Sequence, residues 1–346
     1  HLNGTDADVG MVVAMFPIAA LIIRPFIGNT VDRFGRWGIL LMGLTAFGLS
    51  ILSYNLAATV AMLLIVRFIH GLAWGVVGTA SGTLATDIIP RSRFAEGMGF
   101  YSLASTVSIA IAPAVGLWLI NEYSFGMMFN IAAAFSIMSL ITGMLIKAPH
   151  VQLKKQKKMV IIEKTALMPS IVIFFFNMSY GAIVTFIALY AKTKGIDNIG
   201  IYFTVHAAVL LFTRPFAGRL ADRIGFDRLV LPGVVFMAGG MLSLAFAQSL
   251  WMFLLSAVLY GIGFGITMPC LQTLAVIFTP PERRGSANGT FFTGFDLGIG
   301  FSAMFWGVVA GITGYSMMFA LNLIMLVIGL WIYWTKCNRK IPQAQS

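Results

Sequence analysis

Residues 24–36 read RPFIGNTVDRFGR, and residues 214–225 read RPFAGRLADRIG. The two stretches are 190 residues apart (214 − 24). The same offset relates further identical residues: Gly71 and Gly261, Gly75 and Gly265, Thr83-Leu84-Ala85 and Thr273-Leu274-Ala275, Pro90 and Pro280, and Met127-Met128-Phe129 and Met317-Met318-Phe319. A register without gaps over several segments indicates an internal repeat. The sequence therefore predicts two halves with the same fold and the same orientation.

The composition excludes an ordinary water-soluble protein. Of the 346 residues, 59% are hydrophobic and 10% are charged, whereas soluble domains are nearer half apolar and a quarter charged. The apolar residues come in runs of about 20, which is the length that crosses a bilayer as a helix. Cys270 and Cys337 form no pattern typical of disulfide or zinc scaffolds. The fold class expected is an all-α, polytopic membrane protein.

Eleven spans are predicted, at 9–27, 38–56, 60–88, 96–120, 126–147, 166–191, 199–217, 229–247, 250–279, 286–311 and 314–335. Most of the 23 basic residues then fall in loops on one side, and the positive-inside rule makes that side cytoplasmic. The net charge of +11 is explained by this topology, so no nucleic-acid partner is expected. These spans place Arg24 and Arg214 near helix ends.

The repeat also predicts the domain plan. The helix at 166–191 has no partner in the first half, so we expect a first helix that precedes His1 and is missing from this chain. The parent protein then has twelve helices in two six-helix bundles, with both termini cytoplasmic, as a multi-pass protein of the cell membrane. The expected parts are an N-terminal bundle (1–146), a cytoplasmic linker (147–165), a C-terminal bundle (166–336) and a tail (337–346). Parallel repeats of this kind are one of the main plans of transporters.

The repeated loop carries a family resemblance. Gly28, Asp32, Arg33, Gly35 and Arg36 have the spacing G-x-x-x-D-R-x-G-R, which resembles the signature of the major facilitator superfamily. The second copy matches at Gly218, Asp222, Arg223 and Gly225, with Phe226 where the later arginine would stand. The resemblance implies a latch that closes the cytoplasmic side, with Asp87 as the partner of Arg36. The alternative is that these residues are turn formers and topology anchors.

Arg67 lies about two turns inside the helix 60–88. A charge at that depth costs about 3 kcal/mol on insertion scales, so it is expected to face a cavity or a partner. Arg67, His70, Gly71 and Trp74 share one helix face, and they resemble the proton-coupling motif R-x-x-[QG]-G-x-[GA] of this superfamily, with His70 in place of glutamine. The resemblance places this face on the central cavity. The alternative is a structural arginine and a packed histidine.

Asp296 is an acid about ten residues into the helix 286–311, roughly 15 Å deep. Its counterpart in the repeat is Thr106, so the acid is specific to the second half. We expect Asp296 to take part in proton coupling with Arg67 and His70, or to serve as counter-charge to a cationic substrate. The alternative is an aspartate that is hydrogen-bonded between helices.

The segment Ser108–Leu117 resembles the antiporter signature G-x-x-x-G-P-x-x-G-G, which marks exporters in this superfamily. Pro113 and Gly116 match it, whereas Leu117 departs from it. The resemblance implies a kinked helix that acts as a hinge in outward transport. The alternative is a helix interface built on small residues.

The repeat register also predicts a substrate cavity. Tyr260 and Phe264 are the counterparts of His70 and Trp74. Aromatic and methionine side chains form adaptable surfaces for amphipathic ligands. The expected cavity residues are Trp74, Asn177, Tyr180, Tyr260, Phe264, Met268 and Gln272. The alternative is that this stripe faces lipid or belongs to the packed interior.

Enzyme signatures such as HExxH, a P-loop or GxSxG are absent. Without an ATPase domain, uphill transport must draw on an ion gradient. The sequence therefore favours a transporter, similar to the twelve-helix drug:proton antiporter branch with its bacterial multidrug and metallophore exporters. We expect proton-coupled efflux of small amphipathic compounds by alternating access, in a monomer without cofactor or metal. The open alternatives are a proton-coupled importer of a metabolite and a non-transporting membrane receptor or scaffold.

Overall fold

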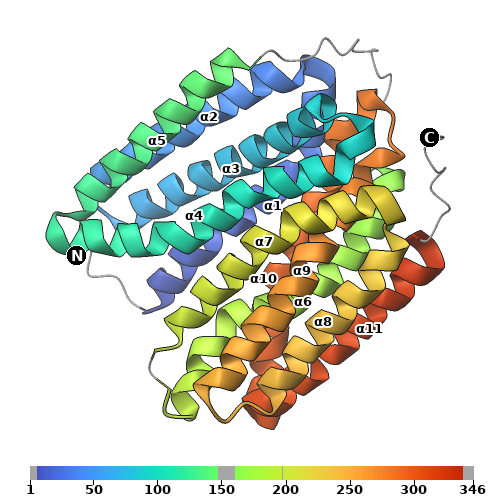
Figure 1. The fold of residues 1–346 in the computed structure, drawn as a ribbon. Helices are drawn as coiled ribbons and strands as arrows, with labels where there is room; N and C mark the ends of the chain where they lie inside the picture. The colour runs from blue at the N-terminus through green and yellow to red at the C-terminus, as the bar shows by residue number, and fades with distance from the viewer. Residues whose placement is uncertain (1–5, 147–159, 197, 338–346) are drawn as a thin grey trace. The chain divides into compact units, whose positions relative to one another are not determined.

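The structure is a computed structural model that describes residues 6–146, 160–196 and 198–337. All its regular elements are helical, and no strand occurs in these ranges (Figure 1). This confirms the all-α class. The main helices are α1 (Asp6–Phe34), α2 (Arg36–Ser53), α3 (Val60–Ile88), α4 (Phe94–Glu122), α5 (Phe125–Leu145), α6 (Lys164–Thr193), α7 (Gly200–Ile224), α8 (Asp227–Ala245), α9 (Leu250–Ile277), α10 (Arg284–Leu321) and α11 (Leu323–Ile332). Short helices are Tyr54–Leu56, Arg91–Arg93, Pro281–Arg283 and Tyr333–Cys337.

The described residues contain nine stretches that are long and apolar enough to cross a membrane. The last of them, Pro281–Cys337, has 57 residues and would be about 85 Å long as one straight helix, far more than a bilayer core of about 30 Å. The backbone leaves the helical conformation at Gly314, where φ is 78° and ψ is 166°. This stretch therefore holds the two predicted spans 286–311 and 314–335. The predicted span 96–120 is α4, so each of the eleven predicted spans has its helix.

The structure divides into two compact units. Unit 1 comprises His1–Ile88, Ala112–Lys164 and Thr279–Thr293, and unit 2 comprises Ile89–Ile111, Thr165–Phe278 and Gly294–Ser346. The division falls inside α4 and inside α10, so each unit includes a helix start from the other half of the sequence. The bundle boundaries expected from the repeat stay a prediction.

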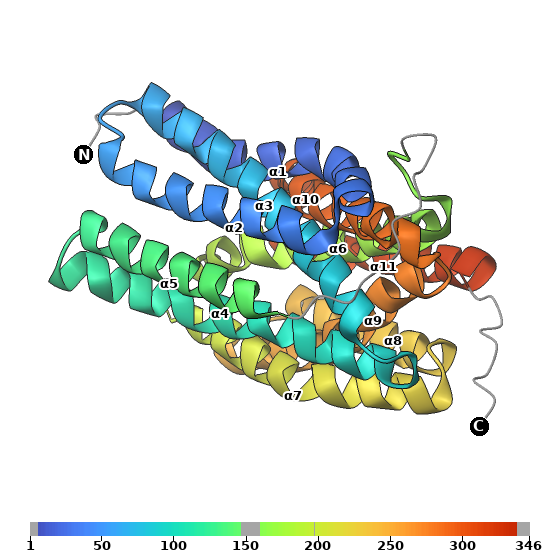
Figure 2. The same cartoon turned by 90° about the horizontal axis from the view of Figure 1, so that it is seen from above.

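Unit 1 is built on α3, which packs against α1 and α2, while α5 lies beside α2 in both views (Figures 1 and 2). A glycine brings α1 and α3 into close contact, because a Cβ on Gly71 would lie 2.3 Å from the carbonyl oxygen of Phe16. Small residues allow such close approach of membrane helices. Near the turn between α1 and α2, apolar side chains of α1, α2 and α3 form a core: Ile27, Val31, Ile39, Leu40, Ala80 and Leu84.

Unit 2 repeats this arrangement, with α7 and α8 packed against α9. The repeat extends to single hydrogen bonds. In unit 1 the indole nitrogen of Trp37 donates to the carbonyl oxygen of Gly143 at 3.0 Å. In unit 2 the residues at the same two register positions are in contact, since the Tyr333 hydroxyl donates to Asp227 at 2.6 Å. The predicted offset of 190 residues therefore relates equivalent positions in space.

Candidate functional site

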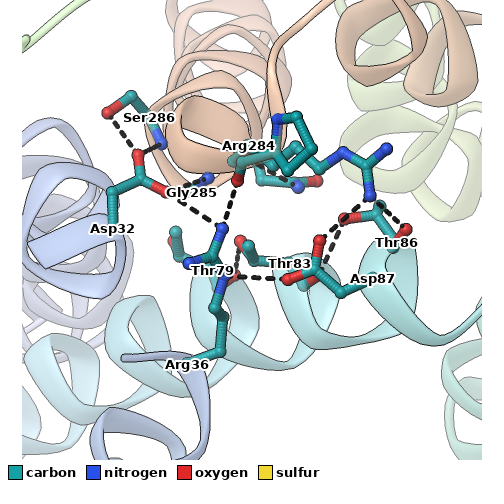
Figure 3. Close-up of polar contacts among 11 residues, drawn as sticks. Asp32, Arg36, Thr79, Thr83, Thr86, Asp87, Arg284, Gly285 and Ser286 are labelled. Carbon is teal, nitrogen blue, oxygen red and sulfur yellow. Dashed lines mark hydrogen bonds and ion pairs between the residues drawn. The ribbon is translucent and has the colours of Figure 1, made fainter. Parts of the chain in front are cut away.

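The first signature segment was predicted to be a loop, but it is helical through Phe34 and forms the end of α1. It forms a carboxylate clamp between α1 and α10, within unit 1 (Figure 3). The buried carboxylate of Asp32 accepts hydrogen bonds of 2.8 Å from the backbone N–H groups of Gly285 and Ser286 and from the Ser286 hydroxyl. These groups lie at the start of α10, where the helix dipole favours an anion. Gly28 permits the approach, because a Cβ there would be 2.7 Å from the Gly285 carbonyl oxygen.

A buried charge network lies beside this clamp (Figure 3). Arg36 Nε is 2.8 Å from Asp87 Oδ2, and Arg284 Nη1 is 3.0 Å from Asp87 Oδ1. Arg284 also donates to the carbonyl oxygen of Thr86 at 2.8 Å, and Arg36 donates to that of Pro281. The predicted contact between Arg36 and Asp87 is thus confirmed. Because the side chains of both partners are at most 5% exposed, removal of one would leave a buried charge without compensation.

The second signature segment is likewise helical, at the end of α7, and forms an equivalent clamp inside unit 2. Asp222 accepts hydrogen bonds from the backbone N–H groups of Ala95 at 3.0 Å and Glu96 at 2.9 Å, at the start of α4. Ala95 and Glu96 are the repeat counterparts of Gly285 and Ser286. A Cβ on Gly218 would lie 2.3 Å from the Ala95 carbonyl oxygen. The same carboxylate-to-helix-start contact therefore occurs twice.

The charges around the second clamp are arranged differently. Glu96 pairs with Arg93 at 2.6 Å and with Arg219 at 2.8 Å. The side chains of these arginines are 68% and 48% exposed, so solvent and salt screen the pairs. The first clamp thus has a buried network, whereas the second has a partly exposed one.

The remaining residues of the predicted latch lie at helix ends. Gly35 and Gly225 have φ values of 96° and 89°, a conformation that glycine adopts without strain. Both glycines therefore make the tight turn that follows each clamp carboxylate. Arg33 and Arg223 are exposed at the ends of α1 and α7. In the part of the chain that the structure describes, neither takes part in the clamp contacts above.

The predicted coupling residues Arg67 and His70 lie in an aromatic cluster of unit 1. The guanidinium carbon of Arg67 is 5.4 Å from the ring centre of Tyr54, and the Tyr54 hydroxyl is 3.0 Å from His70 Nδ1. The His70 ring lies 5.0 Å from Phe16 and 4.5 Å from Phe47. Tyr54, Phe16 and Phe47 were not predicted, because they lie on other helices and outside the quoted motif.

Trp74 completes this cluster. Its ring centre is 6.2 Å from that of Phe16 and 6.0 Å from that of Phe47. Trp74 nevertheless remains 43% exposed. Its counterpart Phe264 is instead 3% exposed and stacks on Tyr180 of α6.

A second aromatic cluster lies in unit 2. The Tyr180 ring stacks on Phe264 at 4.8 Å, on His206 at 5.8 Å and on Tyr260 at 6.4 Å. The structure therefore brings together three of the predicted cavity residues and adds His206. His206, Tyr260 and Phe264 are the register counterparts of Phe16, His70 and Trp74. Each cluster thus contains one imidazole, which is His70 on α3 in unit 1 and His206 on α7 in unit 2.

The other predicted cavity residues of unit 2 are buried. Asn177 donates to the carbonyl oxygen of Phe295 at 2.9 Å. Met268 is 7% exposed and Gln272 is 1% exposed. Neither polar atom of the Gln272 amide has a hydrogen-bond partner among the described residues, an arrangement that costs about 1–3 kcal/mol per buried group.

The structure places the other predicted residues as follows. Asp296 is half-buried on α10. Pro113 lies within α4, but its side chain is outside the described part of the structure. Gly116 is half-buried on the same helix, and a Cβ there would lie 3.8 Å from the sulfur of Met128.

Two arginines correct the predicted span ends. Because α1 ends at Phe34 and α7 at Ile224, Arg24 and Arg214 each lie ten residues before the end of their helix. They are buried, with exposures of 3% and 5%. Arg214 donates to the Ser102 carbonyl oxygen and to the Thr106 hydroxyl, the latter at 2.6 Å. The recurrence of Arg-Pro-Phe in both halves was the signal that could have found them.

Comparisons with known proteins agree with this geometry. The family model described as Major Facilitator Superfamily matches residues 1–202 and 170–346. An uncharacterized MFS-type transporter of Methanocaldococcus jannaschii is 25% identical, over 96% of this chain and 90% of that protein. Multidrug resistance protein MdtG of Escherichia fergusonii is 23% identical, over 96% and 85%.

Two solved structures show the same fold. The human organic anion transporter MFSD10 superimposes with a TM-score of 0.83 at 15% identity, over 93% of this chain and 83% of that chain. The proton:xylose symporter XylE gives 0.82 at 16% identity, over 97% and 88%.

Proposed function

Because the chain belongs to the Major Facilitator Superfamily, we propose that it exports small amphipathic compounds in exchange for protons. The chain is a multi-pass membrane transporter and not an enzyme. Export is favoured by the multidrug resistance relatives and by the match of Pro113 and Gly116 to the antiporter signature. Proton coupling is favoured by Asp296 and Arg67, which lie well inside α10 and α3. Such intramembrane charges mark ion or substrate pathways by default.

The observation that carries the proposal is the duplicated clamp. Asp32 and Asp222 each hold the start of a helix from the other half of the sequence through two backbone N–H groups. Such a contact can be released and remade as a unit, because it joins one side chain to one helix end. Alternating access requires interfaces with two discrete arrangements of this kind. We assign the closing of the cytoplasmic side to these two clamps.

The coupling step is assigned to Asp296, with Arg67 and His70 as modulators. A proton on Asp296 removes its charge and so changes the relative free energies of the outward and inward states. Substrate and proton flows are coupled when each binds the two states with different affinity. The two aromatic clusters, around Trp74 and around Tyr180, are the substrate-contacting surfaces in this scheme. The protein acts as a monomer in the cell membrane, with its clamps on the cytoplasmic side.

Proteoliposomes with an imposed pH gradient test the proposal. The purified protein should accumulate or expel an amphipathic probe against its gradient only when a pH difference is present. Naphthalene-1-carboxylate and 1-naphthylmethylammonium serve as the anionic and cationic probes. Asp296→Asn should abolish the pH-driven flux but keep probe-for-probe exchange, since exchange needs no net proton movement. Glu122→Gln, at an exposed helix end, is the matched control and should behave as the unaltered protein.

Three results would contradict parts of this scheme. Absence of pH-driven flux for both probes argues against proton-coupled transport of such compounds. Flux in the same direction as the protons identifies an importer. Unchanged pH-driven flux in Asp296→Asn removes this residue from the coupling step.

A further inference from the structure

The chain that leads into α6 makes a buried contact with the start of α10. Glu163 is the last residue before α6 and is 1% exposed. Its carboxylate lies 3.2 Å from Nη1 of Arg283, and its backbone N–H donates to the hydroxyl of Thr290 at 2.9 Å. All three residues belong to unit 1. Glu163 falls within the predicted linker 147–165, yet its carboxylate is enclosed and paired.

A run of hydrogen bonds connects Glu163 to the first clamp. The Thr290 hydroxyl, which accepts from Glu163, donates to the carbonyl oxygen of Ser286 at 2.8 Å. Ser286 in turn donates to the Asp32 carboxylate through both its backbone N–H and its hydroxyl. Hydrogen bonds in such a chain polarise and strengthen one another. Glu163 therefore contacts the same helix start that Asp32 holds.

Two consecutive arginines tie this helix start to different parts of unit 1. Arg284 pairs with Asp87 of α3, whereas Arg283 pairs with Glu163. The start of α10 is thus joined both to α3 and to the chain that enters α6. An ion pair between separate segments fixes the position of one segment relative to the other.

The repeat shows how the two clamps differ in this respect. Arg93 is the counterpart of Arg283, and it pairs with Glu96, three residues later in the chain. The counterpart of Glu96 is Ser286, which carries no charge. In the first clamp the carboxylate instead comes from Glu163, 120 residues earlier (283 − 163). The pair of the second clamp is local, whereas the pair of the first clamp joins two segments.

We propose that Glu163 is a positioning residue of the first clamp. Its ion pair and its backbone hydrogen bond hold the start of α10 in the orientation that presents the N–H groups of Gly285 and Ser286 to Asp32. Without the carboxylate, this helix start has more orientational freedom, and the closed clamp is less populated. The inference rests on the proposed role of the clamps in closing the cytoplasmic side.

Alkylation of a buried reporter cysteine measures how often the clamp opens. Thr79 of α3 is fully buried and is drawn with the clamp in Figure 3. The full chain carries Thr79→Cys, with Cys270→Ala and Cys337→Ala, and reacts with N-ethylmaleimide in nanodiscs. Asp32→Asn should raise the alkylation rate most. Glu163→Gln should raise it about 3- to 10-fold, between the values typical of exposed and of buried charged pairs.

A double substitution separates an effect on the clamp from an effect on general stability. In the Asp32→Asn background the clamp is already weakened, so Glu163→Gln should add less than about twofold, because effects that act through one contact are not additive. Exchange of the charges, by Glu163→Arg with Arg283→Glu, should return the rate toward that of the unaltered chain. Glu122→Gln, at an exposed helix end, is the matched control and should leave the rate unchanged.

A second variant covers the case in which Glu163→Gln fails to fold. Thr290→Val removes the hydroxyl that lies between Glu163 and Ser286 at nearly the same volume, and it should also raise the alkylation rate. An unchanged rate in the Glu163 and Thr290 variants would overturn the inference, and so would an equal increase with and without Asp32. If Asp32→Asn itself left the rate unchanged, the proposed role of the clamp would be wrong, and this inference would fall with it.

Discussion

At the scale of single residues, the two clamps have the same hydrogen bonds but different electrostatic surroundings. Asp87 is enclosed with Arg36 and Arg284, all of them buried. Glu96 is instead paired with arginines whose side chains are about half to two-thirds exposed. Burial decides the strength of such pairs, because water and salt weaken an exposed pair and hardly reach a buried one.

We therefore expect Asp87→Asn to be much more destabilising than Glu96→Gln. The first change leaves two buried arginines without their carboxylate and should cost about 3 kcal/mol or more. The second removes pairs to exposed partners and should lower the melting temperature far less. Thermal unfolding of both variants in the same detergent measures the difference. If the melting temperature of Glu96→Gln were as low as that of Asp87→Asn, solvent exposure would not explain how much each ion pair contributes to stability.

At the scale of helices, sequence periodicity and hydropathy are sufficient to find the spans but not to find where each helix ends. The apolar run of α1 stops near Ile27, yet the helix continues through Asn29 and Asp32 to Phe34. Both residues are buried, and the start of α10 supplies the hydrogen bonds of Asp32. Hydropathy reports contact with lipid and cannot anticipate a polar helix end that is satisfied by another helix. For this reason the predicted spans end too early and place Arg24 and Arg214 too near the ends of their helices.

The close approach of these helix ends gives a prediction about glycine. A Cβ at Gly28 or Gly218 would lie within 2.9 Å of at least two backbone atoms of the clamped helix, so alanine must push the helices apart. Gly28→Ala and Gly218→Ala should each lower both stability and transport rate. Gly38→Ala is the matched control, because a Cβ there meets nothing within 4 Å and alanine favours the helix. Thermal unfolding and flux assays on the three variants compare them, and a loss in Gly38→Ala equal to that in Gly28→Ala would contradict the packing explanation.

At the scale of the whole molecule, the duplication explains why part of the candidate site could be predicted. The signature loops, the Arg36–Asp87 contact and the pairing of Tyr260 with Phe264 follow from motif and register. Tyr54, Phe47 and Phe16 contact His70. They could not be found in this way, because the residues at the same register positions of the second half are different: Leu244, Met237 and His206. A repeat predicts the features that both halves share. Contacts that occur in one half alone can be found only in the structure.

The charge of the exported compound decides how the membrane potential acts on the full transport cycle. Export of a monovalent anion in exchange for one entering proton moves two positive charges inward, whereas export of a monovalent cation moves none. Each charge that crosses the membrane is worth about 2.3 kcal/mol per 100 mV. A potassium diffusion potential, set with valinomycin at equal pH, should therefore drive naphthalene-1-carboxylate out of the compartment that is made negative, while protons enter it. Protein-free liposomes correct for passive leak of the probe. If the imposed potential leaves the protein-dependent flux unchanged, the cycle is electroneutral, and one-for-one exchange of an anion against a proton is wrong.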